Sequence, residues 1–176
     1  TVRAKNTDDA DKKIELVERR IRSKAGKYVY AADDEELEEV IGKLLQERHL
    51  SLAVAESCTG GLIADRITNV PGCSNYFERS YVTYSNESKL SDLGVPSSLV
   101  VRHGAVSSEV AEAMAACVRT KSNSDIGLST TGIAGPSGGS EEKPVGLVWI
   151  GYSDRGGTLA LRFNFGDNRR RTKERA

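Results

Sequence analysis

Apolar residues divide the chain into a short opening segment and a longer region of alternating strand and helix patterns. In the opening segment, Ile14, Val17 and Ile21 recur at helical spacing between two strand-like stretches, "TVRAKN" and "GKYVYAADD". A strand, a helix and a strand of this size are too small to bury a core of their own. We therefore interpret residues 1–32 as the tail of a preceding domain and residues 33–176 as the domain that carries the function.

The longer region alternates between the helical spacing of apolar residues and the alternating pattern of strands. It opens with a helical stretch, "DDEELEEVIGKLLQER", which Asp33 or Asp34 is placed to cap. The predicted elements after it are a strand over 50–55, a helix over 59–68, a strand at "RSYVTYS", a short helix capped by Ser85 and ending at Gly94, a helix capped by Ser107, a strand at "DIGLSTT", and a hairpin of "LVWIGYS" and "TLALRFNF". This order predicts an α/β fold, a layered α/β/α sandwich whose sheet is mixed and mostly parallel.

Charge and hydropathy exclude several classes of partner. The 176 residues hold 25 Lys and Arg against 25 Asp and Glu, so no overall field attracts nucleic acid. No apolar run is long enough to span a membrane, and the first residues lack the apolar core of a signal peptide. We expect a soluble, cytoplasmic protein that binds neither nucleic acid nor membrane.

The metal-binding residue types are few and badly spaced. Cys58, Cys73 and Cys117 are odd in number and have no CxxC spacing, which argues against a disulfide framework and against a zinc knuckle. His49 and His103 are the only histidines, which makes a histidine-rich metal site a poor interpretation. We expect chemistry that needs no metal and no cofactor.

Side chains that could react or bind a ligand follow the ends of the predicted strands. Ser57 ends the first strand, Tyr84 and Asn86 follow the second, and Thr131 ends the third. In open α/β sheets ligands bind at these strand ends. Lys89 follows within the next helical turn, on the same face as the capping serine. The pattern therefore predicts one site at the carboxyl ends of the strands.

The stretch "AESCTGG" leaves the nucleophile open between Ser57 and Cys58. A serine here is equally well an N-cap of the next helix, and needs a base such as a histidine or a neutral lysine to react. A thiol at a helix start can be activated, but an unpaired cysteine is more often a buried apolar residue. Lys89 is by default a solvated surface lysine, and His103 offers only a weak alternative base.

A long glycine-rich loop, "TTGIAGPSGGSEEKPVG", is the strongest local signal. Loops of this length inside compact domains are usually functional or disordered, and glycines allow backbone N–H groups to approach a phosphate. It matches neither a Walker loop nor a dinucleotide fingerprint. Lys143 and the run Arg169 to Arg171 add cations that could meet an anion.

Five motifs occur in a fixed order, "AESCTGG", "YVTYSNESK", "HGAVS", "TGIAGPSGG" and "EEKPVG". Together they resemble the C-terminal domain of the competence-damage-inducible (CinA) family, the stand-alone or fused nicotinamide mononucleotide deamidases. The resemblance runs from about Glu35 to the end of the chain. The opening residues resemble the junction of the two-part members, in which a small linking domain precedes the deamidase.

The resemblance implies metal-independent hydrolysis of the carboxamide of nicotinamide mononucleotide, in pyridine nucleotide recycling. It assigns the nucleophile to Ser57 and its base to Lys89, 32 positions later, with Tyr84 orienting the lysine or relaying its proton. Cys58 becomes a packing residue. The residues implied to bind substrate are Thr59, Gly60 and Gly61, whose backbone would stabilise the oxyanion, together with Asn86, Thr131, Gly132, Gly135 and Arg169.

The chain departs from the family pattern near its end. Asn168 stands where the family's "GDR" places the arginine expected to bind phosphate, so we assign that role to the next residue, Arg169. Members normally continue into a C-terminal helix, and we expect that helix to be truncated here. A homodimer is the expected assembly. The alternative to an enzyme is a nucleotide-binding or partner module that binds without cleaving.

Overall fold

The computed structural model describes residues 3–32 and 34–176. They form two compact units, one up to residue 40 and the other from residue 41 onward. Helix α2 (Leu37–Glu47) contains the boundary between them. Within the described residues, no helix combines the length and the apolar character that a membrane crossing requires.

The first unit consists mainly of helix α1 (Thr7–Ala25), followed by the 3-10 turn η1 (Gly26–Tyr28). The Asn6 side chain caps α1 by accepting a hydrogen bond from the N–H of Asp9 at 2.9 Å. The predicted helix is confirmed. The two predicted strands are wrong for the described residues, because 3–6 and 29–32 contain no strand. A strand with no neighbour leaves its backbone groups unpaired. "TVRAKN" also includes residues 1 and 2, which lie outside the described residues.

Helix α2 begins three residues later than Asp34, so that residue is not its cap. The Glu39 carboxylate accepts a hydrogen bond from the N–H of Glu36 at 3.1 Å, which satisfies one of the free amides at the helix start. The other predicted cap, Asp33, lies outside the described residues. The apolar stripe of α2 supplies Leu45 to the core of the second unit.

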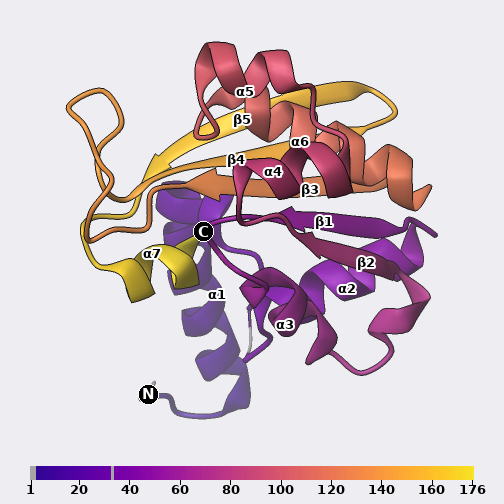
Figure 1. Ribbon diagram of the computed structural model, residues 1–176. Helices are drawn as coiled ribbons and strands as arrows, with labels where there is room; N and C mark the ends of the chain where they lie inside the picture. The colour runs from indigo at the N-terminus through magenta and orange to yellow at the C-terminus, as the bar shows by residue number, and fades with distance from the viewer. Residues whose placement is uncertain (1–2, 33) are drawn as a thin grey trace. The chain divides into compact units, whose positions relative to one another are not determined.

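The second unit contains one sheet of five strands in the order β2, β1, β3, β4, β5 (Figure 1). Their bounds are β1 Leu52–Glu56, β2 Phe77–Val82, β3 Ile126–Gly132, β4 Leu147–Asp154 and β5 Gly157–Asn164. β1 pairs in parallel with β2 and with β3, and β4 pairs antiparallel with β3 and with β5. Only β4 therefore opposes the common strand direction, and the predicted mixed sheet is confirmed.

Helices cover both faces of this sheet, as an α/β/α sandwich requires. Helix α6 (Ser108–Ser122) packs along β1, β3, β4 and β5. Its Val110, Met114 and Val118 meet Ala53 and Ala55 of β1. The alternate residues of β1, Leu52 and Val54, face the opposite way and pack with Leu45 and with Ile67 of α3 (Leu62–Thr68). Because both faces are covered, every residue of β1 is buried.

Two local predictions hold at the helix starts. Ser85 accepts a hydrogen bond from the N–H of Ser88 at 3.0 Å, and Ser107 accepts one from Val110 at 3.3 Å. The helix after Ser85 is the short α4 (Asn86–Ser88), which continues as the π turn η3 (Lys89–Leu93) and ends before Gly94. The pattern missed α5 (Ser97–His103), a two-turn helix in "SSLVVRH" that follows Pro96.

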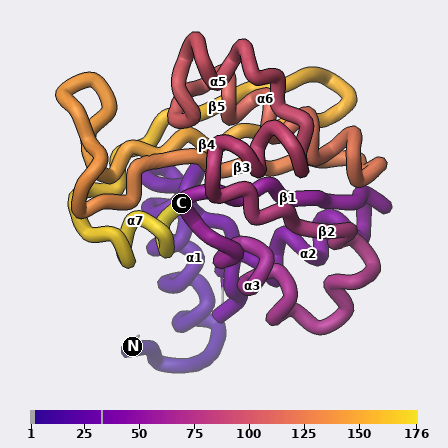
Figure 2. The backbone as a smooth tube through the Cα atoms, in the orientation of Figure 1, coloured from indigo at the N-terminus to yellow at the C-terminus, as the bar shows by residue number. Residues whose placement is uncertain are grey.

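The long loop between β3 and β4 projects beyond one end of the sheet (Figure 2). The last helix, α7 (Arg169–Arg175), touches the start of this loop, because the guanidinium of Arg169 donates a hydrogen bond to the Gly135 carbonyl at 2.9 Å. The carboxyl ends of β1, β2 and β3 meet at this end of the sheet. The fold thus brings the segments singled out in the sequence to one place.

Candidate active site

Ser57 is the first residue after β1 and is fixed by the neighbouring strand. Its N–H donates to the Thr130 carbonyl of β3 at 3.0 Å. On the other side, the N–H of Thr83 donates to the Glu56 carbonyl at 2.8 Å, which aligns the end of β2 with the end of β1. These backbone bonds set the side chain of Ser57 between the two neighbouring strand ends, as the sequence predicted.

Lys89 points inward and reaches Ser57. Its Nζ lies 3.0 Å from Ser57 Oγ, 2.8 Å from the Thr83 carbonyl oxygen and 3.4 Å from the Ser85 carbonyl oxygen. The side chain is only 1 % exposed. The π turn that begins at Lys89 carries the chain from the short helix α4 to Gly94. The lysine is therefore part of a buried cluster and not of the solvated surface.

Burial is the main cause that lowers the pKa of Lys89, because a charged amine loses its hydration there. The neighbouring Cys58 acts in the opposite direction. In the structure Lys89 Nζ donates to the carbonyls of Thr83 and Ser85 and to Ser57 Oγ. Once neutral, the amine keeps two N–H donors for the carbonyls and its lone pair can accept the proton of Ser57 Oγ. The arrangement can therefore activate a serine hydroxyl for attack on an acyl carbon.

Cys58 lies beside this pair but is poorly suited to be the nucleophile. Burial raises the pKa of its thiol to about 11, although nearby hydrogen bonds and Lys89 act against this rise. At pH 7 a thiol of that pKa is a thiolate in roughly one molecule in ten thousand. The packing role expected for Cys58 agrees with its 5 % exposure.

Glu56 is a site residue that the sequence reasoning missed. Its carboxylate is fully buried and accepts hydrogen bonds from the N–H groups of Gly61 at 2.9 Å, Ile63 at 3.1 Å and Ala64 at 3.0 Å. Its Oε1 also accepts a bond from Ser80 Oγ at 3.3 Å. The carboxylate thus ties the turn after Ser57 to the start of α3. A charged residue inside the apolar strand "LAVAE" was the available signal.

A cavity of about 180 Å³ opens beside the Ser57–Lys89 pair. All of its lining residues belong to the second unit. They come from the ends of β1, β2 and β3, from α4 and η3, from the segment before α6, from the start of the β3–β4 loop and from α7. They are Ser57, Cys58, Tyr84, Asn86, Lys89, Ala105, Val106, Thr131, Gly132, Ala134 and Arg169. Seven of the predicted site residues therefore line one cavity.

The other four predicted residues do not line it. Thr59 is buried and its hydroxyl lies 2.8 Å from that of Thr130. The N–H of Gly60 donates to the Ser57 carbonyl at 3.1 Å, and that of Gly61 donates to Glu56. Both amides already have acceptors in this structure, so the geometry gives no support to the predicted oxyanion role of these glycines. Gly135 contributes from outside the cavity, through its carbonyl contact to Arg169.

Tyr84 and Arg169 form a second pair in the cavity wall. The guanidinium of Arg169 donates to the Tyr84 hydroxyl at 2.8 Å, and the phenol is 58 % exposed. None of the contacts of Lys89 involves Tyr84, so the expected orienting role of this tyrosine has no support in the geometry. Asn168 caps α7 by accepting from the N–H of Arg171 at 3.0 Å, which leaves Arg169 to enter the cavity wall.

His103, the weak alternative base, does not line this cavity. Its Nδ1 lies 3.2 Å from a carboxylate oxygen of Glu109, at a separate hollow described below. Among residues 3–32 and 34–176, no group of three His, Cys, Asp or Glu side chains is arranged to hold a metal ion. Lysine is thus the base that the described residues present to Ser57.

Comparisons with known proteins identify the family and the fold. The sequence profile of the CinA C-terminal domain matches residues 34–176. A competence/damage inducible protein, CihA, from Agrobacterium tumefaciens has a solved structure that is 39% identical, with a TM-score of 0.76 over 82% of this chain and 89% of that one. A CinA superfamily protein from Escherichia coli is 28% identical, with a TM-score of 0.78 over 84% of this chain and 88% of its own.

Longer relatives contain the same region. A protein of Caldanaerobacter subterraneus, named for the competence-damage inducible proteins, is 55% identical over 93% of this chain and 40% of its own length. A CinA-like protein of Dictyoglomus thermophilum is 51% identical over 89% of this chain and 38% of its own length. The chain therefore spans about two fifths of the length of these curated relatives. From the profile match, the identities and the shared fold, the chain belongs to the CinA family and contains its C-terminal domain.

Proposed function

We propose that this chain hydrolyses the carboxamide of nicotinamide mononucleotide, giving nicotinate mononucleotide and ammonia. The observation that carries the proposal is the buried amine of Lys89 at 3.0 Å from Ser57 Oγ, held by two backbone carbonyls. A base of lowered pKa next to a hydroxyl is the requirement for serine acyl transfer. The choice of substrate is supported by membership of the CinA family and by the five motifs that resemble its deamidases.

The reaction follows from the two side chains. Neutral Lys89 accepts the Ser57 proton while Oγ forms a bond to the carboxamide carbon. The protonated lysine then gives that proton to the leaving nitrogen, the C–N bond breaks, and ammonia departs from an ester on Ser57. A water molecule, deprotonated by Lys89, attacks the ester carbon. The C–O bond to Ser57 breaks, the serine recovers its proton, and nicotinate mononucleotide is released.

The remaining cavity residues fit the other parts of the substrate. Asn86 carries a side-chain amide in the cavity wall, and we assign to it the hydrogen bond to the oxyanion, since the amides of Gly60 and Gly61 have other acceptors. Arg169 supplies a guanidinium for the phosphate. A cavity of about 180 Å³ suits the ring and its carboxamide, with ribose and phosphate extending toward Arg169.

The test is ammonia release from nicotinamide mononucleotide by the purified chain, with nicotinate mononucleotide measured in parallel by chromatography. We expect the two products in equal amounts, and no turnover of glutamine as a control amide. Ser57→Ala is expected to lower the rate by about a thousandfold or more, because the nucleophile is lost. Binding of the nucleotide without any product from the wild type would instead identify a binding module.

Cys58→Ala separates the two nucleophile candidates. Because the thiol is protonated near neutral pH, we expect kcat to stay within about threefold of wild type, with a stability loss of about 1 kcal/mol from the small cavity created. Ammonia release and urea unfolding measure the two effects. A loss of activity as large as that of Ser57→Ala would make Cys58 the nucleophile and overturn the assignment.

Arg169→Gln tests the phosphate contact. Removing a charge-assisted pair of hydrogen bonds should raise KM by about tenfold or more. We expect kcat to stay within about threefold, because the guanidinium donates to Gly135 and Tyr84 and not to the Ser57–Lys89 pair. The matched control is Arg170→Gln on the same helix, since Arg170 is exposed and pairs with Glu174. Initial rates over a range of substrate concentrations give both constants. An unchanged KM would remove Arg169 from the phosphate site.

A further inference from the structure

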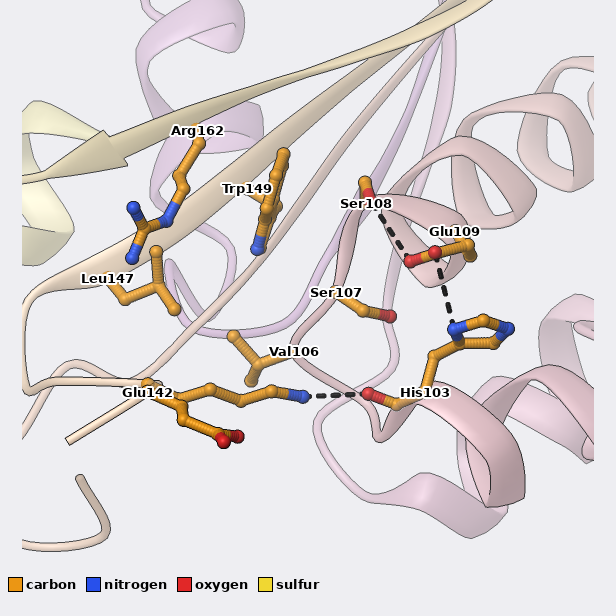
Figure 3. Close-up of a pocket in the computed structure, with 10 residues that line it drawn as sticks. His103, Val106, Ser107, Ser108, Glu109, Glu142, Leu147, Trp149 and Arg162 are labelled. Carbon is orange, nitrogen blue, oxygen red and sulfur yellow. Dashed lines mark hydrogen bonds and ion pairs between the residues drawn. The ribbon is translucent and has the colours of Figure 1, made fainter. Parts of the chain in front are cut away.

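A second hollow, of about 300 Å³, lies next to the candidate active site (Figure 3). It is bordered by the end of α5, the start of α6, the β3–β4 loop and the strands β4 and β5. The lining residues used below are His103, Val106, Glu109, Lys143, Trp149 and Arg162. Val106 also lines the catalytic cavity, so this residue is a shared wall between the two. The hollow has no part in the reaction proposed above.

The sheet register connects the two cavities. Thr131 of β3 pairs with Trp149 of β4, and Trp149 pairs with Arg162 of β5. Paired residues on neighbouring strands project from the same face of a sheet. Thr131 belongs to the catalytic cavity, whereas Trp149 and Arg162 belong to the hollow. The Thr131 hydroxyl donates to the Ala105 carbonyl at 2.7 Å, so the segment before α6 separates the two sites.

Most polar groups of the hollow already have partners. The imidazole of His103 lies 3.2 Å from the Glu109 carboxylate, which also accepts from Ser108 Oγ at 2.9 Å. Lys143 Nζ donates to the His103 carbonyl at 2.7 Å. Figure 3 shows these contacts on the side of the hollow away from β5. The second acid that lines the hollow, Glu142, lies away from Arg162 in Figure 3.

Two donors on the β4–β5 side differ from this pattern. Among the described residues, neither the guanidinium of Arg162 nor the indole N–H of Trp149 has a hydrogen bond or an ion pair. Both groups extend from their strands toward the hollow in Figure 3. A guanidinium matches the two oxygens of a phosphate or a carboxylate, and an indole offers a flat face for stacking together with a single donor.

We propose that this hollow is a second ligand site, for a small molecule in which a planar ring carries an anionic phosphate or carboxylate group. The ring lies against Trp149, and the anionic group accepts hydrogen bonds from Arg162 and from the indole N–H. The volume of about 300 Å³ is in the range of small-molecule sites and exceeds that of the catalytic cavity. Occupancy of this site does not require that the proposed reaction take place.

Trp149 is the single tryptophan of the chain, so its fluorescence reports on this hollow. The probes are AMP, which carries a ring and a phosphate, nicotinate, which carries a ring and a carboxylate, and inorganic phosphate, which has no ring. We expect a saturable fluorescence change with AMP or with nicotinate, and the probe that acts identifies the anionic group. Inorganic phosphate alone should bind at least tenfold more weakly than that probe. No saturable change with either ring-bearing probe would overturn the proposal.

Variants locate the signal. Arg162→Gln should raise the apparent Kd about tenfold or more, because a bidentate charged contact is lost. Arg79→Gln, on the opposite edge strand β2, is the matched control and should leave Kd within twofold. Ser57→Ala should bind the probe like wild type, so failure of the proposed reaction would leave this result standing. A signal lost in Arg169→Gln but kept in Arg162→Gln would place the ligand in the catalytic cavity and overturn the second site.

Discussion

We expect Lys89→Met to abolish the proposed amide hydrolysis, with a fall in kcat of about a thousandfold or more. Methionine has a similar length but no base, so the Ser57 proton has no acceptor, and general base catalysis together with nucleophile activation is lost. Lys89→Arg should be equally inactive, because a guanidinium stays charged at every working pH. Ammonia release under saturating nicotinamide mononucleotide measures both variants. Activity in Lys89→Met within tenfold of wild type would contradict the Ser57–Lys89 mechanism.

The same residue gives a pH dependence of known sign. Because burial lowers the pKa of Lys89 below the ordinary lysine value of 10.5, the active neutral form increases as pH rises through the lowered pKa. The acidic limb of kcat/KM should therefore lie below 10.5. In that same window the Lys89 side chain binds more protons in the unfolded chain than in the folded one, so its contribution to stability rises with pH as far as 10.5.

A matched lysine variant isolates the contribution of Lys89 to the pH dependence of stability. Lys89→Met should remove the part of the rise of unfolding free energy with pH, below 10.5, that the lowered pKa of Lys89 causes, measured by urea titration at each pH. Lys12→Met, at an exposed position on α1, should keep the wild-type slope. Identical slopes in wild type and Lys89→Met would mean that the buried amine does not change its protonation on folding.

Local signals carried most of the prediction of the fold. The caps at Ser85 and Ser107, the stripe of α6 and the β4–β5 hairpin depend on neighbours within a few positions, and all four are present. The short α5 was missed, because its two turns give little periodicity. The strands predicted within residues 1–32 are absent from the described part, residues 3–32. A strand needs a neighbouring strand to pair with, and local composition does not supply one.

The candidate site could be predicted less completely. Strand ends and the glycine loop indicated where it lies, but spacing alone gave Lys89 no reason to point inward, and the resemblance to the family supplied that pairing. The turn after Ser57 shows what sequence cannot give. Its glycines looked available for an oxyanion, whereas their N–H groups are already bonded, to Ser57 and to Glu56. Which acceptor an amide finds depends on the folded geometry.

Glu56→Gln should reduce both stability and turnover, although glutamine is nearly isosteric. Each carboxylate oxygen accepts two hydrogen bonds, Oε2 from Gly61 and Ile63 and Oε1 from Ala64 and Ser80. In the glutamine variant an NH₂ group, which is itself a hydrogen-bond donor, replaces one oxygen. It then points at the two donors that this oxygen accepted from, inside a fully buried site. We expect a loss of about 2–4 kcal/mol in the free energy of unfolding, from hydrogen bonds to a charged acceptor.

Turnover distinguishes a positioning role from a merely structural one. Glu56 holds the turn that follows Ser57, so the nucleophile should be misplaced in the folded Glu56→Gln variant. We expect kcat to fall by at least about tenfold. KM should change little, because the cavity wall formed by residues after β2 and in α7 remains. Asp65→Asn is the control. It removes an exposed acid from the first turn of α3, the helix whose start Glu56 binds, and leaves the hydrogen bonds of Glu56 intact. It should change neither the free energy of unfolding nor kcat appreciably. Urea unfolding and initial rates measure the pair. Should Glu56→Gln unfold at the wild-type urea concentration with wild-type kcat, the buried carboxylate neither stabilises the turn nor positions Ser57.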